Sequence, residues 1–65
     1  MTYTKACNQA SKNAKAANEW RYVVEERWSD APGSEYWSAT EDELETYFYG
    51  CPVILTFGPD GNPEN

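Results

Sequence analysis

The sequence contains no histidine. This absence excludes imidazole acid–base catalysis, a Ser-His-Asp triad and the commonest metal ligand of proteins. No hydrophobic run approaches the roughly 18 residues of a membrane-spanning helix, and no signal-peptide core follows the first residue. Glycine-rich phosphate loops and nucleophile elbows are also missing. We therefore expect a cytoplasmic protein without membrane contact. Its 65 residues predict a single domain over 1–65, whose thin core leaves no room for a large cofactor.

Basic residues are scarce, and none follows Arg27. Five Lys and Arg stand against 11 Asp and Glu, which gives a net charge of −6. Direct nucleic-acid binding and polybasic membrane anchoring both need clustered Lys and Arg, so we expect neither. Residues 1–18 carry a charge of +3, residues 19–27 of −1 and residues 28–65 of −8. This division indicates either an acidic face for a basic partner or a surface that is acidic only for solubility.

Cysteine is rare as well, with Cys7 and Cys51 far apart and no C-x-x-C motif. A metal site without histidine would have to recruit carboxylates, so we expect no metal. Two free thiols are the favoured interpretation and a disulfide is the alternative, because disulfides are disfavoured in the cytosol. Paired carboxylates can hydrolyse glycosides, but this chain is too small to form the enclosed cleft that the reaction needs. We therefore expect no enzyme and no cofactor.

Residues 3–18 predict a helix that Thr4 caps and Asn18 ends. Alanines recur at spacings of four, four and three, which forms a small-residue face that can lie close to a sheet. These residues are Ala6, Ala10, Ala14 and Ala17.

Three segments predict strands. Residues 20–28 alternate in hydrophobicity and are rich in aromatic and β-branched side chains, which favours a strand over a longer helix with Trp20, Val24 and Trp28 at helical spacing. A loop over 29–34 joins it to a short antiparallel strand over 35–39. Residues 53–57 are apolar on both faces, which suggests the centre of a sheet. A turn over 58–61 and a frayed tail over 62–65 would end the chain.

A capping box gives the clearest local signal: Thr40 precedes Glu43 by three residues. The helix that it starts has Leu44, Tyr47 and Phe48 as its apolar stripe and Gly50 as its stop. The predicted fold is a small α+β domain of order α-β-β-α-β, with a three-stranded antiparallel sheet packed against one or two helices.

The aromatic content is high for such a chain, with three Trp, five Tyr and two Phe. A core of this size cannot bury all ten rings, so several must lie on the surface or in an interface. Trp and Tyr are enriched at the hot spots of protein interfaces. Acidic charge and surplus aromatics together predict a protein that binds another protein, or a homodimer.

The order of the segments over residues 22–57 resembles the small acidic phage proteins that inhibit host or defence enzymes. An apolar strand at 22–24 and a polar turn precede an aromatic strand at Tyr36-Trp37, a capped acidic helix and a second apolar strand. The phage inhibitors of uracil-DNA glycosylase and several anti-CRISPR proteins are of this type. The resemblance covers about half of the chain and implies inhibition by occupation of a nucleic-acid site.

We therefore expect a non-enzymatic inhibitor, in the host cytoplasm, that binds a basic surface of a nucleic-acid-handling host or defence protein. Regularly placed carboxylates can imitate a line of phosphates. The alternative is a small homodimeric structural or assembly module whose aromatic face is its own interface. Salt dependence of binding would separate the two. The candidate partner-binding residues are Glu25, Glu26, Trp28, Asp30, Glu35, Tyr36, Trp37, Glu41, Asp42 and Glu45.

Overall fold

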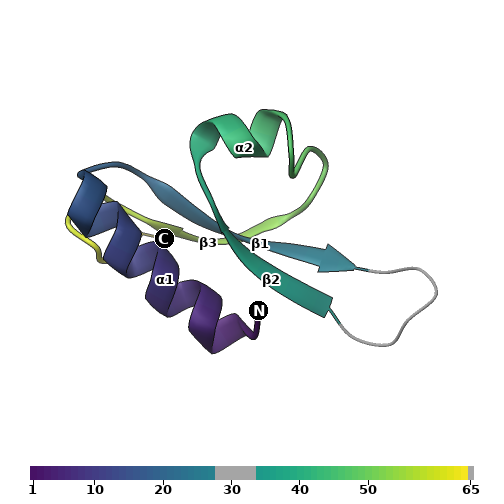
Figure 1. Ribbon diagram of the computed structural model, residues 1–65, viewed down its shortest axis with the longest axis horizontal. Coiled ribbons are helices and arrows are strands. Elements are labelled where there is room, and N and C mark those ends of the chain that lie inside the picture. Colours follow the sequence, from purple (N-terminus) through teal and green to yellow (C-terminus); the bar gives the residue numbers. More distant parts are fainter. Residues whose placement is uncertain (28–33, 65) are drawn as a thin grey trace.

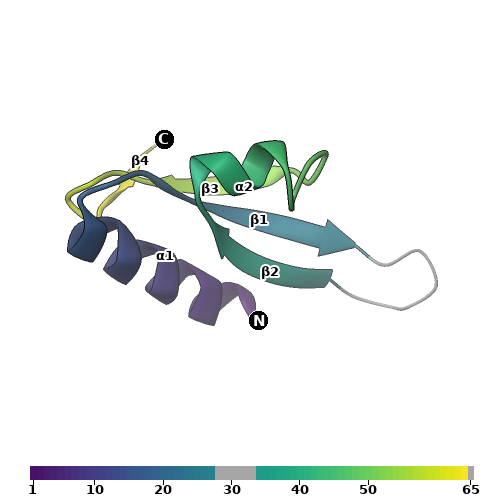
Figure 2. The same cartoon turned by 45° about the horizontal axis from the view of Figure 1, so that its top comes forward.

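The structure, a computed structural model, describes residues 1–27 and 34–64. Its elements are α1 (Tyr3–Ala17), β1 (Arg21–Arg27), β2 (Ser34–Ala39), α2 (Glu41–Glu45), β3 (Val53–Phe57) and β4 (Pro63–Glu64). The strands form one antiparallel sheet in the order β2-β1-β3-β4. Helix α1 lies on one face of this sheet and α2 on the other (Figures 1 and 2). The predicted α+β class is confirmed, and a fourth strand extends the predicted sheet.

Helix α1 begins at Tyr3, where the sequence indicated, but its cap lies two residues before the predicted Thr4. Thr2, in an extended conformation, accepts a hydrogen bond from the Lys5 N–H at 3.2 Å, so Thr2 is the cap and Thr4 lies inside the first turn. At the other end Asn18 adopts the left-handed conformation, with φ 53° and ψ 48°. Asparagine tolerates this conformation better than most residues. Asn18 therefore ends α1 as predicted.

The alanine face of α1 packs directly on the sheet. Ala6, Ala10 and Ala14 are fully buried and form a core cluster with Val23 and Phe57. Ala17 is exposed, so the face ends at Ala14 and not at Ala17. Methyl side chains keep the helix close to the strands, which explains how a chain of this size covers one face of its sheet.

Residues 21–27 form a strand, which decides against the longer helix. β1 pairs with β2 in an antiparallel register that places Val24 opposite Trp37 and Glu26 opposite Glu35. Because side chains alternate between the faces of a strand, Val23 points to α1 and Val24 to α2. Both are fully buried, in separate core clusters. β1 is therefore the centre of the fold.

Strand β3 lies between β1 and β4, but only its end is enclosed. β4 pairs with Thr56 and Phe57, while Val53 and Ile54 are 44 % and 40 % exposed. The pairing with β1 shifts from Val23–Leu55 to Val24–Val53, so Ile54 forms a bulge. The apolar residues 53–57 therefore form a strand that is not buried on both faces along its whole length.

The chain beyond residue 61 differs from the frayed tail that the sequence suggested. Pro63–Glu64 form β4, and the turn before it is held by hydrogen bonds from the Gly58 N–H to the Asn62 carbonyl at 3.0 Å and from the Gly61 N–H to the Gly58 carbonyl at 2.8 Å. The Ser11 hydroxyl donates to the Gly61 carbonyl. This hydrogen bond holds the turn against α1 and so positions β4 beside β3.

Candidate functional site

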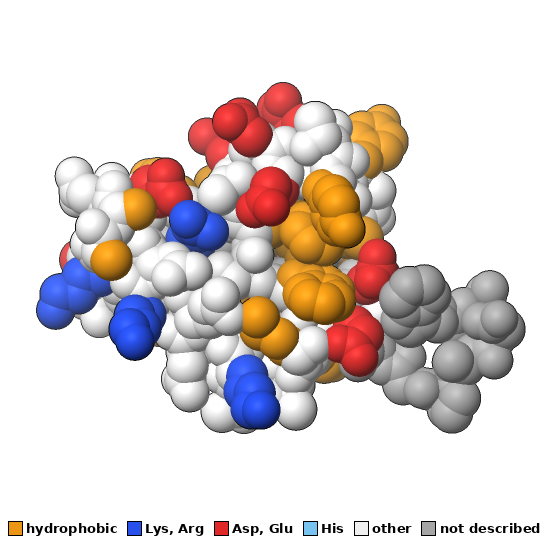
Figure 3. Space-filling view, viewed as in Figure 1, with side chains coloured by type: hydrophobic (Ala, Val, Ile, Leu, Met, Phe, Trp, Pro, Cys, Tyr) orange, Lys and Arg blue, Asp and Glu red, His pale blue; other side chains and the backbone are white. Residues whose placement is uncertain are grey.

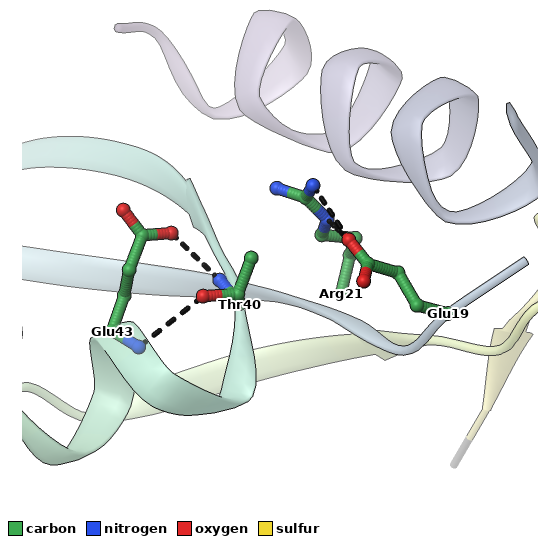
Figure 4. A network of polar contacts seen from close by, with 4 residues as sticks. All are labelled: Glu19, Arg21, Thr40 and Glu43. Carbon is green, nitrogen blue, oxygen red and sulfur yellow. Dashed lines mark hydrogen bonds and ion pairs between the residues drawn. The ribbon is translucent and has the colours of Figure 1, made fainter. Parts of the chain in front are cut away.

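The start of α2 is fixed by the predicted capping box (Figure 4). The Glu43 N–H donates to the Thr40 hydroxyl at 3.2 Å, and the Thr40 N–H donates to the Glu43 carboxylate at 2.9 Å. Two backbone donors at the helix start are thus satisfied reciprocally. This geometry orients the first turn of α2 relative to the end of β2, and with it the acidic side chains of that turn.

Helix α2 is much shorter than expected, because it ends at Glu45. Thr46 leaves the helical region with φ −121° and ψ −80°, and its hydroxyl donates to the Asp42 carbonyl at 3.0 Å. The next turn places Phe48 in the core at 6 % exposure but leaves Tyr47 81 % exposed. The apolar stripe predicted from Leu44, Tyr47 and Phe48 is therefore wrong for Tyr47. A β-branched residue and three aromatics have weak helix propensity, which explains the early end.

Three carboxylates of α2 form the acidic surface of the molecule. Glu41, Asp42 and Glu45 are exposed, and none of them has a salt-bridge partner within residues 1–27 and 34–64. Figure 3 shows one group of Asp and Glu side chains over α2 and others beside the ends of β1 and β2, whereas most Lys and Arg side chains lie over α1. The three exposed carboxylates of α2 thus lie apart from most basic side chains and have no ion pair within the described residues.

The negative charge of Glu41 also affects Tyr22, a residue of strand β1. The pKa of Tyr22 is raised, first by burial of its ring and second by the negative charge of Glu41. Both causes disfavour the phenolate. Glu41 is therefore near enough to Tyr22 for its negative charge to disfavour the phenolate.

Two further predicted residues, Glu26 and Glu35, lie on the same face of the sheet as α2. They are opposite each other in the β1–β2 pairing, which brings two like charges together. The Met1 ammonium group pairs with Glu35 and reduces this repulsion. The Met1 carbonyl also accepts a hydrogen bond from the Tyr36 N–H at 3.1 Å, so the chain start covers part of the β2 edge.

Glu25 and Tyr36 are on the opposite face, beside α1. The Tyr36 hydroxyl donates to the Glu25 carboxylate at 3.2 Å. The Tyr36 ring meets Tyr3 edge to face, with 5.4 Å between the centroids. The predicted surface is therefore split: the structure brings Glu26, Glu35 and the α2 acids to one side and these two residues to the other.

Trp37 belongs to the core more than to the surface. It stacks on Phe48 with 6.4 Å between the rings and 27° between their planes. Its indole N–H is buried without a hydrogen-bond partner in the described structure. Trp37 therefore has limited area to offer a partner. The predicted residues Trp28 and Asp30 lie outside the described residues.

Sequence reasoning missed the aromatic side chains that are most exposed. Tyr47 and Tyr49 are each 81 % exposed, and Trp20 is 46 % exposed. The signal for the first two was available in Thr46, a poor helix former that precedes them. Trp20 lies between the helix end at Asn18 and the first strand, where a connecting segment commonly exposes its side chains.

The two cysteines are free and lie in different parts of the core. Cys7 packs with the cluster under α1 and Cys51 with the cluster under α2, so the sheet separates them. Among the described residues, no group of three or more cysteines and carboxylates is arranged to hold a metal ion. The described helices include none that is long and apolar enough to cross a membrane.

Comparisons with models of protein families, with curated proteins and with solved structures found no match.

Proposed function

We propose that this protein is a non-enzymatic inhibitor that binds, through its acidic side, a basic surface of a nucleic-acid-handling host or defence protein in the cytoplasm. The observation that carries the proposal is the exposed and uncompensated trio of Glu41, Asp42 and Glu45. Their backbone is held by the capping box rather than by ion pairs. Their charges are therefore available to an incoming partner.

The distribution of charge supports a basic partner that approaches from one side. Lys5, Lys12 and Lys15 are exposed on α1, which lies across the sheet from α2 (Figure 2). A molecule divided in this way orients itself in the field of a basic surface before contact, which raises the association rate. A groove that attracts phosphates attracts these carboxylates for the same reason. Occupation of that groove would exclude nucleic acid.

Two variants of equal net charge test the proposal. The first, Glu41→Gln, Asp42→Asn and Glu45→Gln, neutralises the acidic trio. The second, Asn8→Lys, Gln9→Lys and Ala16→Lys, adds three positive charges at exposed positions of α1, which changes the net charge by the same amount. Both would be used, with the unchanged protein, to capture partners from bacterial lysate. Each captured protein would then be identified and assayed for nucleic-acid binding with and without this chain.

We expect the unchanged protein and the α1 variant to capture the same nucleic-acid-binding protein and to displace its nucleic acid. The α2 variant should lose at least about tenfold in affinity, equivalent to roughly 1.4 kcal/mol. Equal capture by all three proteins, or a captured partner that keeps its nucleic acid, would refute the proposal.

A second candidate function, a homodimeric module, is favoured by a different region. Residues 46–59 contain no charged side chain, and four exposed large hydrophobic residues lie there: Tyr47, Tyr49, Val53 and Ile54. β4 leaves the edge of β3 uncovered at Val53 and Ile54. Uncharged edges are prone to pair with another strand. Light scattering should then give a dimer that Ile54→Lys dissociates, whereas a monomer at all concentrations excludes this function.

A further inference from the structure

A cleft of about 370 Å³ opens between the end of α1 and the start of α2. Asn18, Glu19 and Trp20 line it from the α1 side, and Thr40, Glu41 and Asp42 from the α2 side. The lining residues come from two segments about 20 positions apart in the sequence, and α1 and the capping box of α2 fix them independently. The cleft is therefore a feature of the folded chain and not of one flexible loop.

One wall of the cleft is aromatic. Trp20 is 46 % exposed, although tryptophan is costly to leave in water. An exposed indole beside carboxylates offers a cation both a π face and negative charge. Trp20 thus provides the cleft with a contact surface that an acidic cluster alone would lack.

The charge in the cleft is negative after its internal ion pair is taken into account. Glu19 is engaged by Arg21, with contacts of 3.0 Å to Nε and 2.7 Å to one terminal nitrogen (Figure 4). Glu41 and Asp42 have no such partner in the part of the chain that the structure describes. Asn18 also brings the C-terminal end of the 15-residue helix α1 to the cleft, and that end of a helix favours cations. These features attract a cation and repel an anion.

We propose that this cleft binds an arginine side chain of the basic partner, with the guanidinium over Trp20 and its N–H groups donating to Glu41 and Asp42. The inference rests on the proposed function and names the contact that anchors it. Arginine suits the cleft better than lysine, because its planar guanidinium stacks on aromatic rings, donates to two carboxylates at once and is weakly hydrated. A lysine ammonium would keep more of its water.

The probe for this test is the blocked tripeptide acetyl-Gly-Arg-Gly-amide, followed by NMR. The uncharged counterpart with citrulline in place of arginine is the control peptide. We expect saturable shifts of the Trp20 indole N–H and of the Glu41 and Asp42 amides, with millimolar affinity. The indole signal is assigned with Trp20→Phe. The citrulline peptide should cause no saturable shift.

Two variants of equal net charge locate the binding. Glu41→Gln with Asp42→Asn removes the cleft carboxylates and should weaken the peptide about tenfold. Asn8→Lys with Gln9→Lys raises the net charge by the same two units at exposed positions of α1, outside the cleft. This variant should change affinity less than about twofold, because distant exposed charges are screened. Trp20→Leu should also weaken binding, which a purely electrostatic association would not show.

The failures of the two proposals can be told apart. If the peptide shifts no cleft residue, or if both paired variants weaken it equally, the arginine site is refuted. The protein could still capture a nucleic-acid-binding partner through its acidic side. If the peptide binds in the cleft but neutralising the α2 trio leaves partner capture unchanged, the proposed function is refuted and the arginine site remains.

Discussion

Val23 and Val24 are neighbours in β1, yet their side chains support opposite faces of the sheet. Val23 packs under α1 with Ala10 and Phe57, and Val24 packs under α2 with Ala39 and Phe48. Both are fully buried. One strand therefore supplies a central residue to each of two small cores.

Truncation of either valine should destabilise the whole fold. Val23→Ala and Val24→Ala each remove buried methyl groups and should cost about 2 kcal/mol. Val53→Ala, at a position that is 44 % exposed, is the matched control and should cost less than half as much. Urea denaturation would measure the three differences. A cost for Val24→Ala no larger than that of the control would contradict the core under α2.

The capping box predicts a graded response at Thr40. Thr40→Ala leaves the Glu43 N–H without its side-chain acceptor and should cost about 1 kcal/mol. Thr40→Ser and Thr40→Asp keep an acceptor oxygen and should be nearly neutral. Thermal denaturation of the four proteins would compare them. Equal stability of all four proteins would contradict a stabilising role of the capping interaction.

Gly61 and Gly50 allow a comparison between backbone strain and steric contact. Both have φ near +85°, where a side chain costs about 1 kcal/mol. At Gly61 an added Cβ would also lie 3.2 Å from the Ser11 carbonyl oxygen and 3.2 Å from the Lys15 Cβ, whereas at Gly50 it would meet nothing within 4 Å. Gly61→Ala should therefore destabilise more than Gly50→Ala in thermal denaturation. The reverse order would contradict the packing of this turn on α1.

Local patterns predicted the fold class and most element boundaries. Alternation over 20–28, the Thr40–Glu43 spacing and the alanine spacing each depend on neighbours in the sequence, so they could be recognised without tertiary information. β4 could not be recognised in this way. Its two residues are a strand only because the 58–62 turn, fastened to Ser11, presents them to β3.

The candidate surface was less predictable than the fold, because it depends on which face each residue occupies. Glu25 and Glu26 are adjacent and acidic, yet alternation sends them to opposite faces of the sheet. The exposure of Tyr47 depends on where α2 ends. Trp20 lines the same cleft as the acids of α2 only because of the tertiary fold. The structure therefore places those predicted partner-binding residues that it describes on two faces of the sheet, which the sequence did not indicate.

The Tyr22 hydroxyl should report the charge of Glu41. Burial and Glu41 raise the pKa of Tyr22 above its usual value near 10. Because the folded state holds the Tyr22 proton more tightly than the unfolded state, the neutral phenol contributes to folding stability. This contribution is complete below about pH 10 and is lost as the pH rises through the pKa of the folded state. In an NMR titration, Glu41→Gln should lower the Tyr22 midpoint, and Glu45→Gln should not. Identical midpoints in all three proteins would contradict this placement of Glu41.

We propose above that Glu41, Asp42 and Glu45 guide a basic partner to this protein. The most direct test is the association rate constant with the captured partner, measured from low to high salt. We predict a rate that falls steeply with salt for the unchanged protein and for the α1 lysine variant, and a slow, nearly salt-independent rate for the neutralised trio. Equal rates and equal salt dependence for the unchanged and neutralised proteins would contradict the claim and leave the acidity as a device for solubility.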